Sequence, residues 1–435
     1  MTAATRHRGR ARGFTLIELM ISLTAGLLIS SAAFLLARNA SRFFSKEAAI
    51  TTAQFANVIA MTRLSSDLKR SAYAATPNIQ TEDWLCGNPA TWPVGMQKLA
   101  GIHIIEDGSV AAHGAAHTLS AVNNVDPDSV VITGAFSTTE IFSVSHIVDG
   151  GGTITVVLQN DAPMIRSLLA AQGNSQTLDD IFRPGRMLRI IEKDEGKMMF
   201  GIIQAVNAAG AAPNPASPKV ELVLSAAVAL PQVRLPGECG CIGLCTGAVV
   251  NPVSRVLYDL RQIDIGANPG YAPLYSPALH DVSAFHRSLA EATRTDLVRV
   301  ELDANDQEIP GTLELVAEYG VDLEFGITRE VPQNPPVAVP VLQRLPLGHP
   351  DVYNTAAAVN GGLGTPENIR AVQVRFSTRA SRQDRDADIG FIGDDQGRLR
   401  YSLGPVSATN PERGFARMRT LITEVALMNH PRNQP

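Results

Sequence analysis

The apolar stretch from Phe14 to Ala37, FTLIELMISLTAGLLISSAAFLLA, constrains the fold of this chain more than any other feature. It contains 24 residues, more than the ~20 that a helix needs to span a bilayer. Its one ionisable side chain is Glu18. Because a charge inside a spanning helix is costly and usually has a partner, we expect a membrane helix in which Glu18 has a role. A glutamate that snorkels to the helix end is the plainer alternative.

The residues before this stretch orient it in the membrane. The first thirteen residues contain four arginines and no Asp or Glu, so the positive-inside rule places the N-terminus in the cytoplasm. Everything after about residue 40 is then expected outside the cytoplasmic membrane. A secretory signal peptide has a shorter apolar core, of ~7 to 15 residues, followed by a small-residue cleavage site. The length and Glu18 therefore favour a helix that is retained.

Gly13 followed by FTLIEL resembles the cleavage and methylation signature of type IV prepilins and their type II secretion relatives. The resemblance implies that a prepilin peptidase cuts between Gly13 and Phe14, removes residues 1–13 as a leader, and methylates the new Phe14 amine. It also implies assembly roles for Glu18 and Thr15. Many major pilins carry a helix-kinking proline in this segment, whereas the one candidate breaker here is Gly26.

The implied partner of Glu18 agrees with simple electrostatics. A protonated Phe14 amine and the Glu18 carboxylate would both lie in low dielectric, where an unpaired charge is costly and a paired one is tolerated. We therefore expect Glu18 to select a neighbouring subunit whose N-terminus lies at the same depth.

A helical pattern continues beyond the apolar stretch. Residues 41–74 contain no Gly or Pro, and Val58, Met61, Leu64 and Leu68 recur at helical spacing. Pro77 is the first stop signal. The pattern predicts one helix to about Ala74, with a transmembrane half at 14–37 and a periplasmic amphipathic half at 38–76. Two helices broken between residues 39 and 41 are the alternative.

From residue 77 onwards the hydrophobic period is two. In one segment Val321, Leu323, Phe325 and Ile327 alternate with polar residues or glycine, which is typical of antiparallel sheet with one buried face. The region 77–435 is therefore predicted to be a β-rich periplasmic domain, which could comprise two lobes. The expected class is α+β and pilin-like, with the long helix packed on this domain. Predicted strands lie in SVVITGAF, TITVVLQN, KVELVLS, DLVRVELD, GVDLEFGI and RAVQVRFSTR.

Several blocks of the later sequence, in this order, resemble PilW-type minor pilins. They are FRPGRMLRIIEKDEGKMMFGIIQAV, DLVRVELDANDQEIPGTLELVAEYGVDLEFGI, IRAVQVRFSTRAS and RMRTLITEVALMN. The resemblance implies a minor pilin that primes pilus assembly with other minor pilins and the major pilin, and that lies at the pilus tip beneath a PilY-type adhesin. Residues 78–180 show no such resemblance.

Two other functions fit the same N-terminus. A J-type pseudopilin of a type II secretion system shares the leader, although such proteins are usually much shorter. A membrane-anchored periplasmic binding or enzymatic protein would keep residues 1–13. A minor pilin would wait in the inner membrane, with its N-terminus in the cytoplasm and its C-terminal domain in the periplasm, and would reach the pilus tip on the cell surface after assembly.

Four cysteines, Cys86, Cys239, Cys241 and Cys245, would be exported to an oxidising compartment and are expected to form disulfides. A bond between Cys239 and Cys241 is disfavoured because so short a loop strains the bridge. Cys86 is then expected to pair with Cys239 or Cys241. A metal site and free thiols remain alternatives, although zinc ligands usually come as two close pairs, unlike this cluster of three.

The remaining chemistry is sparse. Asp303, Asn305 and Asp306 cluster oxygen donors that calcium favours, but they lack the spacing of a twelve-residue calcium loop, so a solvated hairpin turn is expected there. Without the four leader arginines the formal charge falls from −5 to −9, which argues against nucleic-acid binding. The chain has no catalytic or phosphate-binding motif of the common classes, so we expect neither enzymatic activity nor a cofactor.

Overall fold

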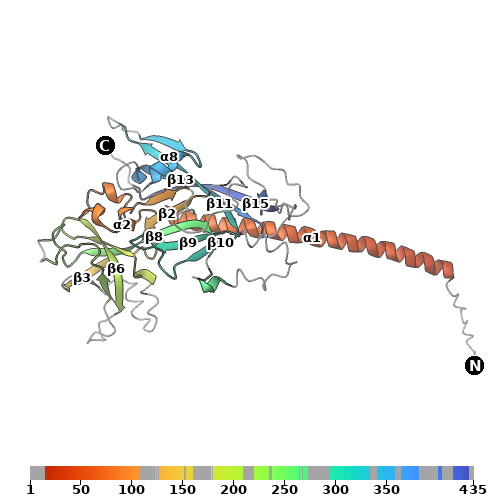
Figure 1. The fold of residues 1–435 in the computed structure, drawn as a ribbon, viewed down its shortest axis with the longest axis horizontal. Helices are drawn as coiled ribbons and strands as arrows, with labels where there is room; N and C mark the ends of the chain where they lie inside the picture. The colour runs from red at the N-terminus through yellow and green to blue at the C-terminus, as the bar shows by residue number, and fades with distance from the viewer. Residues whose placement is uncertain are drawn as a thin grey trace, which may run out of the picture. The chain divides into compact units, whose positions relative to one another are not determined.

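The computed structural model describes most of the chain as one long helix and a β-rich region (Figure 1). The described residues are 15–106, 123, 125, 127–150, 153–159, 178, 180–208, 220–234, 238–263, 265–266, 268–272, 294–333, 340–357, 364–381, 400–403 and 415–430. The leader, including Gly13, and Phe14 lie outside them. The chain divides into two compact units, residues 1–51 and 52–435, each of which is described by itself.

Helix α1, Leu16–Lys69, is a single helix of 54 residues. It runs through residues 39–41 without a break, since no proline or glycine interrupts this part. The predicted end at Ala74 was wrong by five residues. Ala72 and Ala74 have φ of 60° and 50°, a left-handed conformation that cannot continue a right-handed helix.

The part of α1 in the second unit buries one stripe. Its buried residues are Ala53, Asn57, Ala60, Met61, Leu64, Asp67 and Leu68. Val58, which the helical spacing assigned to this stripe, is 54% exposed, so that assignment was wrong. At 3.6 residues per turn Val58 lies about 60° beyond Met61, outside the buried arc.

Six antiparallel strands form a closed ring of paired strands in the order β8, β3, β4, β7, β6, β5 and back to β8. Each strand contributes to one buried apolar cluster, which includes Phe142, Val156, Leu222 and Val250. Closure leaves this small barrel without a free sheet edge. The strands are β3 Phe142–Asp149, β4 Ile154–Leu158, β5 Met187–Ile191, β6 Met198–Ala208, β7 Val220–Leu224 and β8 Val249–Arg261.

Strand β8 belongs to both the barrel and an extension of the same sheet. Its first half pairs with β3 and β5, and its second half pairs with β2 and β9. Pro252 pairs with Leu188 of β5 on one side. On its other side β8 changes its partner from β3 to β2 near this position, so the missing N–H of the proline interrupts no pairing there. The added strands are β1 Ile102–Ile105, β2 Ser129–Gly134, β9 Asp296–Leu302 and β10 Glu314–Ala317.

A second antiparallel sheet has the strand order β12, β11, β13, β15, β14. Its inner face and the β1, β2, β8, β9 face share one apolar core, to which α1 adds Met61, Leu64 and Leu68. Within the second unit, residues 52–435, Figure 1 shows β3 and β6 at one end, β15 towards the other, and β8 and β9 between them. The strands are β11 Gly320–Val331, β12 Val341–Leu345, β13 Ile369–Arg379, β14 Arg400–Ser402 and β15 Phe415–Ala426.

Short helices complete the described part of the chain. They are α2 Val94–Gln97, α8 Pro350–Ala356, and the 3-10 turns η1 Ile79–Thr81, η2 Pro89–Thr91, η3 Pro269–Tyr271 and η5 Pro366–Asn368. Together, one long N-terminal helix and a large antiparallel β-sheet domain confirm the α+β class.

The six predicted strand segments coincide with β2, β4, β7, β9, β11 and β13. The four apolar residues of the alternation predicted for β11 are all buried, but Asp322, one of the alternating polar residues, is also buried. The four are Val321, Leu323, Phe325 and Ile327. Asp322 is buried because it accepts a hydrogen bond from Arg375 of β13, at 3.0 Å. The other described strands, β1, β3, β5, β6, β8, β10, β12, β14 and β15, were not predicted. In β8, buried polar residues and Pro252 hide the alternating pattern.

Candidate functional site

Helix α1 begins with a reciprocal pair of hydrogen bonds between Thr15 and Glu18. The Thr15 N–H and hydroxyl both donate to Glu18 Oε2, at 3.0 and 2.9 Å, and the Glu18 N–H donates to Thr15 Oγ1 at 3.3 Å. This arrangement is a capping box, which satisfies two of the amide groups that a helix start leaves unpaired. The two predicted assembly residues are therefore in direct contact.

From Leu19 to Ala37 the helix carries no charged side chain and is exposed on every side. Leu16, Leu28, Ile29 and Leu36 are each at least 71% exposed. The helix is long and apolar enough to cross a membrane. Exposure all round a helix indicates that something other than this unit covers it. A single-pass membrane anchor accounts for this exposure.

The four cysteines form two disulfides in the second unit. Cys86 bonds to Cys241 across 155 residues, and Cys239 bonds to Cys245 across 6. Gly240 and Gly243 exchange backbone hydrogen bonds of 3.2 Å, so Cys241 and Ile242 form the tip of a tight turn. Gly240 has φ of 130°, a conformation that favours glycine. Of the two long-range pairings left open, the structure has Cys86 with Cys241.

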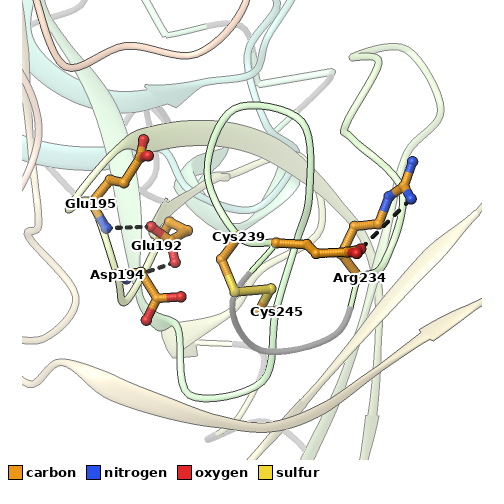
Figure 2. Close-up of a disulfide and its surroundings, with 7 residues drawn as sticks. Glu192, Asp194, Glu195, Arg234, Cys239 and Cys245 are labelled. Carbon is orange, nitrogen blue, oxygen red and sulfur yellow. Dashed lines mark hydrogen bonds and ion pairs between the residues drawn. A yellow bond between two sulfur atoms is a disulfide. The ribbon is translucent and has the colours of Figure 1, made fainter.

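One group of residues near this turn places three candidate metal-binding atoms together, from Glu192, Asp194 and Cys239. Figure 2 shows that the sulfur of Cys239 is bonded to Cys245 and that the Glu192 carboxylate accepts from the backbone N–H groups of Asp194 and Glu195. A sulfur in a disulfide is not a thiolate, the form that binds zinc. The group therefore lacks the thiolate ligand that a zinc site would take from Cys239.

The predicted calcium candidate lies in the turn between β9 and β10. Asp303 Oδ1 accepts from the N–H groups of Asn305 and Gln307, at 2.7 and 2.8 Å. Asp306 forms ion pairs with Lys98, at 2.7 Å, and with Arg255. Burial tends to raise the pKa of Asp306, but the two cations lower it below its usual value. The Asp306 carboxylate therefore already has two cationic side chains as partners.

A buried polar cluster, which was missed from the sequence, joins α1 to the sheet. Asp67 Oδ2 accepts from Tyr258 Oη at 2.8 Å and from Arg299 Nε at 2.9 Å. Burial, and then the Asp67 charge, raise the pKa of Tyr258. For Arg299, burial opposes the charge, but Asp67 and Tyr258 raise its pKa. The position of Asp67 on the stripe of Leu64 and Leu68 was the available signal.

The Thr15–Glu18 capping box lies in a region that matches a known family model. Residues 8–34 match the family model described as the prokaryotic N-terminal methylation motif. The match supports a type IV prepilin-like protein that prepilin peptidase processes. No curated protein matches this chain. No solved structure matches it either.

Proposed function

We propose that this chain is a minor pilin of PilW type, which primes assembly of a type IV pilus and remains at or near its tip. The observation that carries the proposal is the match over residues 8–34, which contains Gly13, Phe14 and the Thr15–Glu18 capping box. The large β-rich unit that follows is compatible with a subunit that presents a surface at the tip, and no enzymatic role is proposed for it.

In this proposal prepilin peptidase cleaves between Gly13 and Phe14, and the Phe14 amine is methylated. The subunit waits in the inner membrane with its N-terminus on the cytoplasmic side and residues 52–435 in the periplasm. Two disulfides support export to an oxidising compartment. The partners are other minor pilins, the major pilin and a PilY-type adhesin.

Cleavage is tested first. Gly13→Val is expected to leave a membrane protein longer by the thirteen leader residues, because a branched side chain replaces the residue before the cut bond. Gly9→Val, a matched change inside the leader, should be processed. The measurement is the intact mass together with N-terminal sequencing of the purified chain. Normal maturation of Gly13→Val would exclude this cleavage site.

Deletion of the gene then separates a pilus subunit from a secretion pseudopilin. Loss of surface pili with normal export of enzymes supports the minor pilin. Loss of an exported enzyme with normal pili would instead support the J-type pseudopilin.

A further inference from the structure

The two disulfides of the second unit overlap along the chain. Cys86 bonds to Cys241, and Cys239, which precedes Cys241, bonds to Cys245. In sequence order, the first cysteine therefore pairs with the third, and the second pairs with the fourth. An oxidant that joins cysteines in the order of their export would form Cys86–Cys239 and Cys241–Cys245 bonds. Neither of these bonds occurs in the structure.

Loop closure in the unfolded chain does not select the native pairing. Cys86 lies 155 residues from Cys241, and its alternative partners Cys239 and Cys245 are 6 residues apart. Because the closure entropy depends on the logarithm of loop length, the unfolded chain forms the three loops from Cys86 with probabilities within about a tenth of one another. Oxidation before folding is therefore expected to give a mixture of pairings.

The native long-range bond depends on strands that meet in the folded barrel. The Cys86 N–H donates to the Met198 carbonyl at 2.8 Å, at the start of β6. Ile191 of β5 pairs with Met198 on one side and with Val249 of β8 on the other. Since Val249 follows Cys245 closely in the sequence, this junction of three strands brings the cysteine-rich turn to Cys86. A chain that is oxidised before these strands pair lacks this guidance.

A wrongly paired chain has no thiol with which to correct itself. The sequence contains four cysteines, and two disulfides use all of them. Exchange of disulfide partners begins with attack by a thiolate, so a thiolate from another molecule is required. In the folded unit Cys86 and Cys245 are 7% and 1% exposed. Correction therefore has to precede the burial of these two residues.

We propose that this chain is a substrate of an exported thiol–disulfide isomerase, a protein that presents a reactive dithiol, and that the isomerase acts on the segment from Cys239 to Cys245. The proposal rests on one part of the proposed function, export to an oxidising compartment. It adds a partner that acts during folding, before any assembly of the subunit.

The exchange conserves thiols and disulfides. In the isomer expected from ordered oxidation, the isomerase thiolate attacks Cys245, forms a mixed disulfide with it and releases Cys241 as a thiolate. The Cys241 thiolate then bonds to Cys86 and releases the Cys239 thiolate. Finally, Cys239 bonds to Cys245 and releases the isomerase thiolate. The chain has two disulfides before and after, so no oxidant or reductant is consumed.

The first experiment measures pairing in the purified full-length chain. Reduced chain in urea is oxidised with diamide, freed of the reagent and diluted into detergent, with or without a catalytic amount of reduced dithiol isomerase. Mass spectrometry of a non-reduced digest gives the fraction with the Cys86–Cys241 bond. Without isomerase we expect about one third, since one of three connectivities is native. The isomerase should raise this fraction about twofold or more, towards the limit of threefold, and an isomerase with serines at its active site should not.

Two matched variants remove the choice of partner. Cys239→Ser with Cys245→Ser leaves Cys86 and Cys241, and Cys86→Ser with Cys241→Ser leaves the local pair. Each variant can form one intramolecular bond, so diamide alone should form it and the isomerase should not change its yield. The bond can be identified whether or not the variant folds.

The second experiment measures the chain in its own cells. Without their exported disulfide isomerase, the amount of chain with the native bonds should fall about threefold, in line with one native connectivity in three. The amounts of the two double variants should not change.

The outcomes are distinct from those that test the proposed function. Complete native pairing after diamide alone would overturn the proposal. An equal dependence of the unaltered chain and the double variants on the isomerase would also overturn it, because the isomerase would then act without exchanging bonds. Neither result bears on the pilin assignment, which Gly13→Val and deletion of the gene test separately.

Discussion

The two parts of α1, Leu16–Thr51 and Thr52–Lys69, share one helix but differ in how their apolar side chains are satisfied. In the first part, large apolar residues such as Leu16 and Leu28 are 79% and 73% exposed. In the second part, Leu64 and Leu68 are almost fully buried in a core shared with two sheets. Continuous secondary structure therefore does not imply a continuous environment. The first part contains a stretch long and apolar enough to cross a membrane, whereas the second packs into the core of its own β-rich unit.

The largest expected effect concerns the buried polar cluster through which Asp67, in the second part of α1, contacts Tyr258 and Arg299 of the sheet. Asp67→Asn should lower the free energy of unfolding by about 3 to 5 kcal/mol, because it leaves Arg299 buried beside a neutral partner. Urea unfolding can be followed by fluorescence, since both tryptophans, Trp84 and Trp92, lie in the second unit. Lys69→Ala, at the exposed end of the helix, is the control. A loss below 1 kcal/mol for Asp67→Asn would contradict the importance of this cluster.

The apolar stripe is tested by truncations in each part of the helix. Leu64→Ala should lower the free energy of unfolding by about 2 to 5 kcal/mol through lost burial and a residual cavity. Val58→Ala, at an exposed position of the same part, should change it by about 0.5 kcal/mol or less. Leu28→Ala should leave unfolding of the β-rich unit unchanged. Equal losses of unfolding free energy in Val58→Ala and Leu64→Ala would contradict the assignment of Leu64, and not Val58, to the buried stripe.

Acid should lower the stability of the second unit, because two of its buried histidines, His430 and His103, have lowered pKa values. His430 Nδ1 donates to the Pro366 carbonyl, and its Nε2 accepts from Ser71 Oγ, each at 3.1 Å. Burial lowers its pKa to about 4, and burial followed by Arg255 lowers that of His103 to about 4. In the unfolded chain a histidine titrates near 6.5, so the unfolded state binds more protons between these values. Stability is therefore retained above pH 6.5 and lost as the pH falls towards 4.

This linkage predicts a loss of about 2 kcal/mol per histidine between pH 6.5 and 5. His430→Gln should remove about one proton equivalent from the slope of unfolding free energy against pH. Chemical unfolding at several pH values measures that slope. An unchanged slope in the variant would mean that His430 is accessible to protons in the folded protein.

The smallest expected loss of stability concerns Asn429, whose side chain caps the C-terminal end of α1. Asn429 Nδ2 donates to the carbonyls of Lys69 and Ser71, both at 3.1 Å. Asn429→Ala should cost about 1 kcal/mol, measured by the same urea titration. Met428→Ala, at a side chain that is 78% exposed, should be neutral. Similar effects of the two substitutions would show that the contact adds no stability.

The predictions from sequence succeeded where the signal lies within a short window. The apolar run, the motif from Gly13 to Glu18 and the alternation in β11 are all local patterns, and they identified the helix, the family resemblance and six strands. Errors arose where a local pattern had a non-local cause. Val58 has helical spacing but lies outside the arc that is buried. Strand β8 mixes polar and apolar residues although all but its first residue are buried, so its sequence shows no alternation.

The chain alone therefore specified a long helix with an ionisable residue near its start, followed by antiparallel strands, since helix and strand periods are properties of neighbouring residues. Tertiary structure decided the closure of the six-stranded ring through β8, the choice of Cys241 for Cys86, and the meeting of Asp67 with Arg299. These partners are 155 and 232 residues apart. No local rule connects such positions, because their proximity follows from the packing of strands that are distant in the chain.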